Sequence, residues 1–188
     1  MRPFVLASVL ALLGSGCLAD TTSDDTTPSP SPPPPPYACV EAESFRMGEI
    51  NATIDTNKGA IKIVLYGDRS PITVCNFLRY AEETFYDGTV WHRICAHVIQ
   101  AGGVDPYTQE QKPGHEPIKN EAPTSQLRNY KYTLGMARNN APDSATTHFF
   151  INVKDNNYLD FDGQYAPGYA VFGNVTAGQS VVDEIART

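Results

Sequence analysis

The sequence predicts a mainly β domain, a closed antiparallel barrel with two helices. Short apolar runs that alternate with polar residues recur along residues 45–188, and this two-residue period is that of half-buried strands. Gly, Pro, Asn and Asp separate the runs at short intervals, as turns require. Only two segments, 71–83 and 180–187, show helical spacing. Many short strands with few helices are typical of a closed antiparallel barrel.

Length and composition indicate one folded domain with an extension. The 188 residues include 8 Phe and 10 Tyr, and 41% of the chain is hydrophobic, which is enough for a substantial core. The net charge is −7 and no basic residues cluster, so no nucleic-acid partner is expected. No apolar run reaches the roughly 18 residues that a membrane-spanning helix needs.

Residues 1–16 have the features of an export signal. Arg2 supplies a positive start, an apolar segment follows, and small residues precede Cys17. This arrangement resembles a bacterial lipoprotein signal, in which Cys17 is lipidated and begins the mature chain. Ordinary cleavage after Ala19 is the alternative. We therefore expect an exported, periplasmic or cell-envelope protein, whose only membrane contact is a lipid on Cys17.

Residues 17–44 are expected to be a linker. They are rich in Thr, Ser, Asp and Pro and carry too few apolar side chains to form a core. The proline run predicts a polyproline II segment, which is a semi-rigid spacer. Two interpretations stay open: a stalk that holds the domain away from a membrane, and a proline-rich ligand for another domain.

A hairpin and a helix open the domain 45–188. Residues 52–56 and 60–66 alternate apolar and polar side chains on either side of the turn-forming tripeptide NKG. In 71–83, Pro71 suits the first helical turn. Four apolar side chains recur there at helical spacing: Val74, Phe77, Leu78 and Ala81.

Shorter strands make up most of the remaining domain. Residues 104–129 contain several prolines and are expected to be mostly loop. Further strands are predicted at 89–95, 131–136, 148–153 and 169–175, and a second helix at 180–187 with Ser180 as its N-cap.

Three motifs stand in a fixed order in this domain. WHR at 91–93 is followed by QAGG at 100–103, MAR at 136–138 by THFFI at 147–151, and Leu159-Asp160 by VFGNV at 171–175. Together they resemble the cyclophilin family of peptidyl-prolyl isomerases, in particular its bacterial periplasmic branch. The resemblance implies an eight-stranded barrel with a helix over each end. It also implies a monomeric isomerase without a cofactor, whose partners are proline-containing segments of folding or exported polypeptides.

Isomerisation of an X-Pro bond needs a site that prefers the twisted amide. The planar amide is protected by a barrier of about 18–20 kcal/mol. At the twisted point the prolyl nitrogen gains a lone pair, which a fixed, permanently charged donor stabilises. Arg93, in WHR, falls on the catalytic arginine of the family. The resemblance implies the following substrate-binding residues: Val98, Ile99, Gln100, Ala137, Arg138, His148, Phe150, Tyr158, Leu159 and Tyr169.

Other interpretations of these residues stay open. Phe150 and its apolar neighbours could be ordinary core residues, and Arg93 could face water on an edge strand. The family has Gln directly before Gly-Gly, whereas here Gln100 stands one residue earlier, so it either reaches the same place or the function of that Gln is lost. Tyr158 stands where many members carry the Trp that is linked to cyclosporin binding. The chain could also be a weakly catalytic chaperone module that binds proline segments, or a scaffold.

The histidines and cysteines predict no metal site. Four His show no HExxH spacing and four Cys no CxxC pair. If Cys17 is lipidated, at least one of the other three cysteines is unpaired, and Cys39 could pair with Cys75 or Cys95.

The last strand of the family pattern is missing from this sequence. In cyclophilins a strand follows the last helix and closes the barrel beside the first strand, but here the sequence stops at Thr188. An exposed strand edge is an aggregation hazard. We expect an open edge, a strand from a partner chain, or residues 40–50 folded over the gap, which would bring Cys39 near Cys75.

Overall fold

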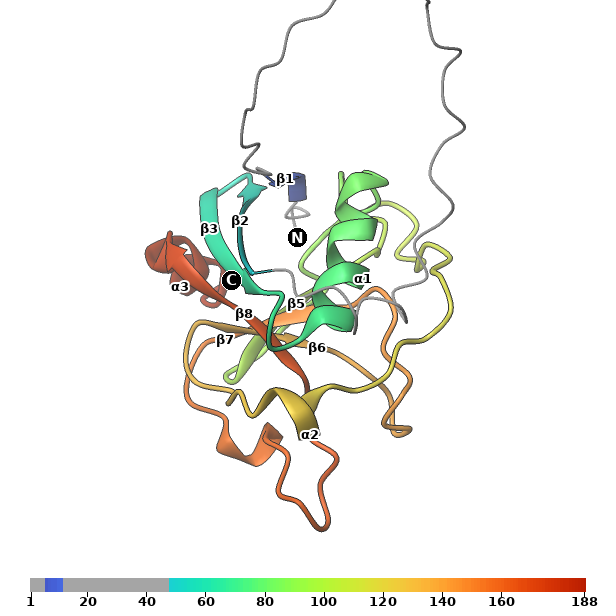
Figure 1. Cartoon of the computed structure of the whole chain (residues 1–188). Helices are drawn as coiled ribbons and strands as arrows, with labels where there is room; N and C mark the ends of the chain where they lie inside the picture. The colour runs from blue at the N-terminus through green and yellow to red at the C-terminus, as the bar shows by residue number, and fades with distance from the viewer. Residues whose placement is uncertain (1–5, 12–47) are drawn as a thin grey trace, which may run out of the picture.

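One antiparallel sheet with three helices forms the domain in the computed structural model, which describes residues 6–11 and 48–188 (Figure 1). The strand order is β1-β2-β3-β8-β6-β7-β5-β4. The strands are β1 (Leu6–Ala11), β2 (Glu49–Thr56), β3 (Gly59–Tyr66), β4 (Arg93–Ile94), β5 (Val98–Ala101), β6 (Thr133–Met136), β7 (Phe149–Asn152) and β8 (Val171–Ala177). The helices are α1 (Pro71–Glu82), α2 (Ala122–Ser125), α3 (Gln179–Ile185) and a 3-10 turn, η2 (Asn157–Leu159).

The predicted hairpin is present as β2 and β3. Thr56 pairs with Gly59 across the turn, and the Thr56 hydroxyl donates to the Gly59 carbonyl at 2.7 Å. Gly59 has a φ of +130°, which only glycine adopts without strain. β2, the first strand of the hairpin, begins at Glu49, three residues before its predicted start.

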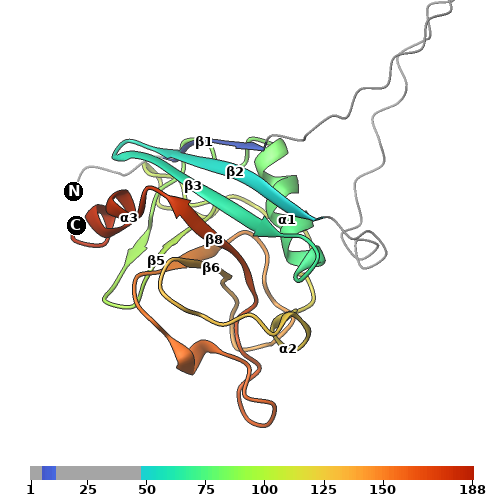
Figure 2. The same ribbon diagram turned by 60° about the vertical axis from the view of Figure 1, so that its left-hand side comes forward.

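The helix α1 covers one side of the core. Its apolar face is buried, and the Phe77 ring lies 5.2 Å from that of Phe149 and 5.4 Å from that of Phe172. No side chain of the preceding residue caps the helix. Instead the Glu121 carboxylate, from the distant loop, accepts from the N–H groups of Ile72 and Thr73. β3 runs between α1 and α3 in both views (Figures 1 and 2).

The strand pairing does not close the sheet into a barrel. β1 and β4 end the order, and within residues 6–11 and 48–188 no pairing joins them. The domain is therefore mainly β with an antiparallel sheet, as predicted. The expected closed barrel is not observed among the described strands. No helix of the described segments is long and apolar enough to cross a membrane.

Several predicted boundaries are wrong. The predicted strand 89–95 is a strand only at Arg93–Ile94, because the chain turns back at once to form β5. Residues 104–129 are mostly loop, as predicted, with only the short helix α2 among them. The last helix begins after Gly178 rather than Ser180, because the Gly178 carbonyl accepts from the N–H groups of Val181 and Val182.

The outer edge of β2 is covered by an unexpected segment. Leu6–Ala11, within the predicted export signal, pairs antiparallel with Ala52 to Thr56 of β2, with one irregularity between Leu6 and Ser8. Ile50 belongs to β2 itself and pairs with Leu65, so it does not fold over the gap. The rest of the predicted fold-back, residues 40–47, lies outside the described residues, as do Cys17 and most of the signal and linker.

The two cysteines in the part of the chain that the structure describes are in different states. Cys95 is a free thiol, so its alternative pairing with Cys39 is wrong. Cys75 is disulfide-bonded. The predicted pairing of Cys75 with Cys39 stays a prediction, because Cys39 lies outside the described residues.

Candidate active site

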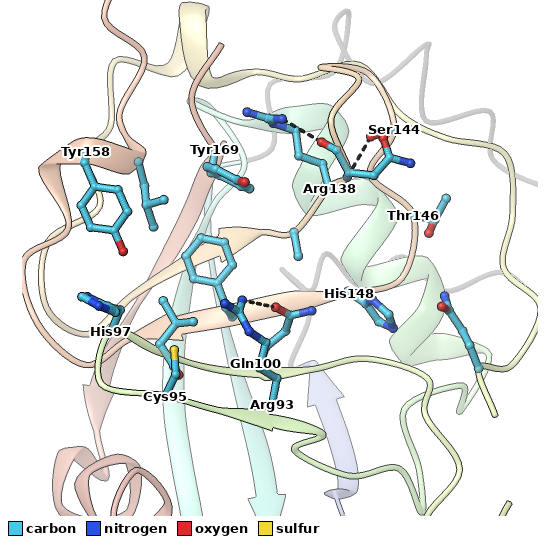
Figure 3. A pocket seen from close by; sticks show the side chains of 16 residues that line it. Arg93, Cys95, His97, Gln100, Arg138, Ser144, Thr146, His148, Tyr158 and Tyr169 are labelled. Carbon is cyan, nitrogen blue, oxygen red and sulfur yellow. Dashed lines mark hydrogen bonds between the residues drawn. The ribbon is translucent and has the colours of Figure 1, made fainter. Parts of the chain in front are cut away.

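A cavity of about 640 Å³ opens beside β4, β5 and β7 and is closed on its other side by loops that follow β6 and η2 (Figure 3). Arg93 lines it, and so do all but one of the expected substrate-binding residues. These are Val98, Gln100, Ala137, Arg138, His148, Phe150, Tyr158, Leu159 and Tyr169. Residues that lie far apart in the sequence therefore line the same cavity.

The hairpin β4–β5 places Gln100 beside Arg93. The two residues are directly paired across the strands, so their side chains lie on the same face. Gln100 Oε1 accepts from Arg93 Nη1 at 3.3 Å. The Gln100 amide nitrogen is then left to donate to His92 Nε2, which lies 3.2 Å away. Gln100 thus reaches Arg93 although it stands one residue before the position typical of the family.

Ile99 is the exception among the expected site residues. Its side chain is fully buried in the core, whereas its neighbours Val98 and Gln100 line the cavity. Successive side chains of a strand point to opposite faces, so Ile99 cannot share the cavity with both neighbours. Assigning Ile99 to the pocket was wrong.

Two cavity residues on the β4–β5 turn escaped sequence analysis. Cys95 and His97 both line the cavity, and the His97 ring lies 5.8 Å from that of Tyr158, edge to face. The sequence signal was that only a few residues separate Arg93 from Gln100. Pairing of these two residues forces a tight turn, and the side chains of that turn lie over the cavity. Four polar loop residues also line it and carried no sequence signal: Gln111, Asn139, Ser144 and Thr146.

Phe150 forms an apolar floor. The side chain is only 3% exposed and pairs across β6 and β7 with Gly135. A Cβ atom at Gly135 would lie 2.3 Å from Cζ of Phe150, so only glycine leaves room for this ring. The Tyr169 ring contacts Phe150 edge to face at 5.9 Å. The Phe150 ring thus packs directly on the backbone of Gly135.

Arg138 is fixed along the opposite wall from Arg93 (Figure 3). Its Nε donates to the Gly168 carbonyl at 2.9 Å and its Nη1 to the Asn139 carbonyl at 2.8 Å. Its guanidinium carbon lies 4.3 Å from the centre of the Tyr169 ring. The N–H of Ala137 donates to the His148 carbonyl at 2.9 Å, so this N–H is not available to a bound peptide.

Two histidines, His148 in the cavity lining and His92 outside it, have lowered pKa values. The rings of His92 and His148 lie 4.7 Å apart. Burial, and next the neighbouring His148, lower the pKa of His92 to about 4, and burial also lowers the pKa of His148. Arg93 and Arg138 are the two arginines of the cavity lining, which contains no Lys, Asp or Glu. No group of three metal-ligating side chains occurs in the segments that the structure describes.

Comparison with protein families bears directly on this geometry. Residues 51–188 match the family described as cyclophilin type peptidyl-prolyl cis-trans isomerase/CLD. This chain belongs to the cyclophilin family. The match begins in β2 and extends over every residue that lines the cavity, and this cyclophilin is a peptidyl-prolyl cis-trans isomerase.

Bacterial relatives of this cyclophilin cover the same part of the chain. Peptidyl-prolyl cis-trans isomerase B of Escherichia coli is 48% identical over 136 residues, which are 71% of this chain and 82% of the relative. A peptidyl-prolyl cis-trans isomerase of Streptomyces antibioticus is 49% identical over 135 residues, with 70% and 80% covered. Peptidyl-prolyl cis-trans isomerase A of Dickeya dadantii is 42% identical over 134 residues, with 71% and 70% covered.

Solved structures show the same fold. A cyclophilin-type isomerase from Cryptosporidium parvum, crystallised with the dipeptide Ala-Pro, superposes with a TM-score of 0.62 at 23% identity, covering 72% of this chain and 84% of the other. A cyclophilin from Hirschia baltica gives a TM-score of 0.60 at 19% identity, covering 70% and 65%. The predicted mainly β cyclophilin fold is thus confirmed.

Proposed function

We propose that this cyclophilin isomerises X-Pro bonds of folding or exported polypeptides in the cavity between Arg93 and Phe150. The observation that carries the proposal is the position of the Arg93 guanidinium, which is held by Gln100 at the rim of an apolar floor. The proline ring packs on Phe150, against the walls that Leu159 and Val98 provide.

Arg93 supplies the charge that the twisted amide requires. As the C–N bond rotates, the prolyl nitrogen loses its resonance with the carbonyl and gains a lone pair. A guanidinium N–H beside that nitrogen stabilises the twisted amide more than either planar form, and only such a difference accelerates the reaction. The preorganised donor costs no reorientation at the moment of rotation.

Gln100 positions Arg93. Its amide oxygen accepts from the guanidinium, and its amide nitrogen faces His92, which is unprotonated near neutral pH. The guanidinium can only donate, so it fixes Oε1 of Gln100 as the acceptor and leaves Nε2 to donate to His92 Nε2, which accepts in the tautomer that carries its proton on Nδ1. The bond directs Arg93 along the cavity instead of into solvent.

Exchange spectroscopy by NMR on an X-Pro peptide tests this assignment. The domain should accelerate cis–trans exchange, and Arg93→Ala should remove most of the acceleration. Arg93→Lys should also be poor, because an ammonium group lacks the planar fork of donors. If Arg93→Ala binds the peptide and catalyses cis–trans exchange at the rate of the unmodified protein, other residues act on the proline segment and Arg93 is not catalytic.

We further propose that the domain acts outside the cytoplasm on a lipid anchor, as a member of the periplasmic branch. The support is the sequence pattern before Cys17 and the proline-rich linker 17–44. At about 3.1 Å per residue, an extended linker of this length reaches roughly 80 Å. The domain would then meet chains that emerge into the envelope at some distance from the membrane surface.

A further inference from the structure

We propose that this cavity selects peptides that carry an acidic side chain within two residues of the proline, and that Arg138 is the residue that binds it. The inference rests on the proposed function, because it names the substrate class of the same site. Four features of the cavity support it: its charge, the state of the Arg138 guanidinium, the lack of an internal partner, and the distance to the Phe150 floor.

The wall of the cavity is positive although the chain is acidic. Among its sixteen lining residues are Arg93 and Arg138, and no Asp or Glu. The net charge of the whole chain is −7. A concave site lined by one sign of charge attracts ligands of the opposite sign. A substrate segment with an acidic side chain is therefore favoured over one with a basic side chain.

The Arg138 guanidinium is held in place with donors to spare. Its two hydrogen bonds go to the carbonyls of Gly168 and Asn139, and one face lies on the Tyr169 ring. A guanidinium has five N–H donors in one plane. Three N–H groups thus remain for a ligand, and the geometry that a carboxylate recognises is already set.

No carboxylate of the described segments neutralises Arg138. Asp160 pairs with Arg128 at 3.7 Å, and Asp162 accepts from backbone N–H groups of its own loop. Among the described residues no salt bridge includes Arg138. A half-buried guanidinium without a counter-ion is available to form charge-assisted hydrogen bonds with the carboxylate of a ligand.

A purely structural role explains Arg138 less well. The Gly168 carbonyl, to which Arg138 donates, also accepts from Asn120 Nδ2 at 3.2 Å. Asn120 Nδ2 donates in addition to the Pro167 carbonyl at 2.9 Å. The loop is therefore tied down by Asn120, and anchoring it does not require a charged residue at position 138.

The distance from the proline floor fits the proposal. The Tyr169 ring centre is 5.9 Å from that of Phe150 and 4.3 Å from the Arg138 guanidinium carbon, so guanidinium and floor are at most the sum of these apart. An extended peptide advances about 3.3–3.6 Å per residue. A Glu side chain one or two residues from a proline on Phe150 can therefore reach Arg138.

The contact should act on binding rather than on the rotation step. The acidic side chain is remote from the prolyl nitrogen, so it interacts with Arg138 equally in the planar and twisted states. Interactions of this kind lower KM and leave kcat unchanged. For a partly exposed ion pair with a fixed guanidinium, we expect KM for Glu peptides about three- to tenfold below that for matched Lys peptides.

The test uses acetylated, amidated peptides with one Glu, Gln or Lys placed one or two residues before or after the proline. NMR exchange with the full chain gives kcat and KM for each without a coupling protease that has its own charge preference. The ratio of kcat/KM for Glu to that for Lys is compared within each variant, so that changes in the amount of folded protein cancel. Arg138→Gln should bring the ratio to about one, and Arg138→Glu should invert it.

Arg128→Gln is the matched control. Arg128 is exposed, lies outside the cavity, and its substitution changes the net charge by the same amount as Arg138→Gln. It should leave the ratio at its original value. The ratio of the unmodified protein should also fall at high ionic strength, because the contact is partly exposed.

Equal KM values for Glu and Lys peptides at all four positions would overturn the selectivity while leaving the isomerase function intact. A ratio that survives Arg138→Gln, or that changes as much in Arg128→Gln, would show that Arg138 is not the residue responsible. Absence of acceleration for every peptide would instead refute the proposed function, and the two failures are thus distinguishable.

Discussion

Substituting Gly135 by Ala should damage the active site from beneath its floor. Gly135 lies on β6 directly opposite Phe150, outside the cavity. An added Cβ would lie 2.3 Å from Cζ, 2.6 Å from Cε2 and 2.9 Å from Cε1 of the Phe150 ring. Carbon atoms pack at about 3.5–4.0 Å, so the ring must move by more than about 1 Å.

The structure indicates where the ring can go and what this costs. Phe149 and Ile151 belong to the core whereas Phe150 lines the cavity, so the ring is displaced into the space proposed for the proline. Overpacking of this kind costs about 1–3 kcal/mol of unfolding free energy. A misplacement of about 1 Å at a reacting site can lower the rate about 100-fold. We expect kcat/KM to fall by roughly this factor and Tm by roughly 3–10 °C.

NMR exchange on an X-Pro peptide and thermal unfolding measure the two effects separately. Gly48→Ala is the matched control, because an added Cβ at Gly48 meets no atom within 4 Å. In the double variant Gly135→Ala, Phe150→Leu, the smaller side chain leaves room for the new methyl group. Gly135→Ala should therefore cost less stability in the Phe150→Leu background than in the unmodified protein. A double-mutant cycle measures this difference as the coupling free energy between the two positions.

Normal kcat/KM and Tm in Gly135→Ala would refute the reasoning. They would mean that β6 and β7 separate without cost, and that Phe150 is not held against Gly135. A loss of stability with full activity would refute only the predicted fall in kcat/KM, because the ring would then have moved without narrowing the proline site.

Four further outcomes are expected. Arg93→Ala should leave the unfolding free energy within about 1 kcal/mol while activity is lost, since Arg93 is exposed and its main contact is Gln100; denaturant unfolding checks this. Stability should fall as pH drops from about 6.5 to about 4, because the unfolded chain takes up a proton that His92 in the folded state does not. The pKa shift corresponds to roughly 3 kcal/mol, which partial exposure reduces to about 1–2 kcal/mol, and His92→Phe should flatten the pH profile. Cyclosporin should bind weakly, and Tyr158→Trp at this exposed position should strengthen cyclosporin binding with little change in turnover. A binding titration with cyclosporin measures this, and tight binding by the unmodified protein would contradict it. Cys17→Ser should move the protein from the membrane pellet to the soluble exported fraction, whereas equal partitioning of both forms would indicate cleavage after Ala19.

Local sequence signals predicted the elements that frame the site. Period-two alternation around the NKG turn identified β2 and β3, and helical spacing after Pro71 identified α1. The motif around Arg93 and the run that contains Phe150 pointed to residues that line one cavity. These features depend on neighbours within about one turn or one strand pair, which a sequence displays directly.

Contacts between distant segments could not be predicted in this way. The shift of one residue between the expected and observed positions of Gln100 is resolved by the tight β4–β5 turn, which also moves Ile99 into the core. The Glu121 carboxylate at the start of α1 and the Arg138 side chain on Tyr169 join loops that no motif connects. Pairing of Leu6–Ala11 with β2 contrasts with the export-signal pattern of the same residues.

The sequence by itself therefore determined the mainly β class, the principal strands and first helix, and the positions of an arginine and a phenylalanine that line the cavity. Tertiary structure alone decided which side chains of the β4–β5 turn face the cavity, that Gly135 supports its floor, and that Arg138 has no carboxylate partner among residues 48–188. The physical reason is the range of the interactions. Periodicity and turn chemistry act between residues close in the chain, whereas register across a turn and packing between loops are set by the many long-range contacts of the folded domain.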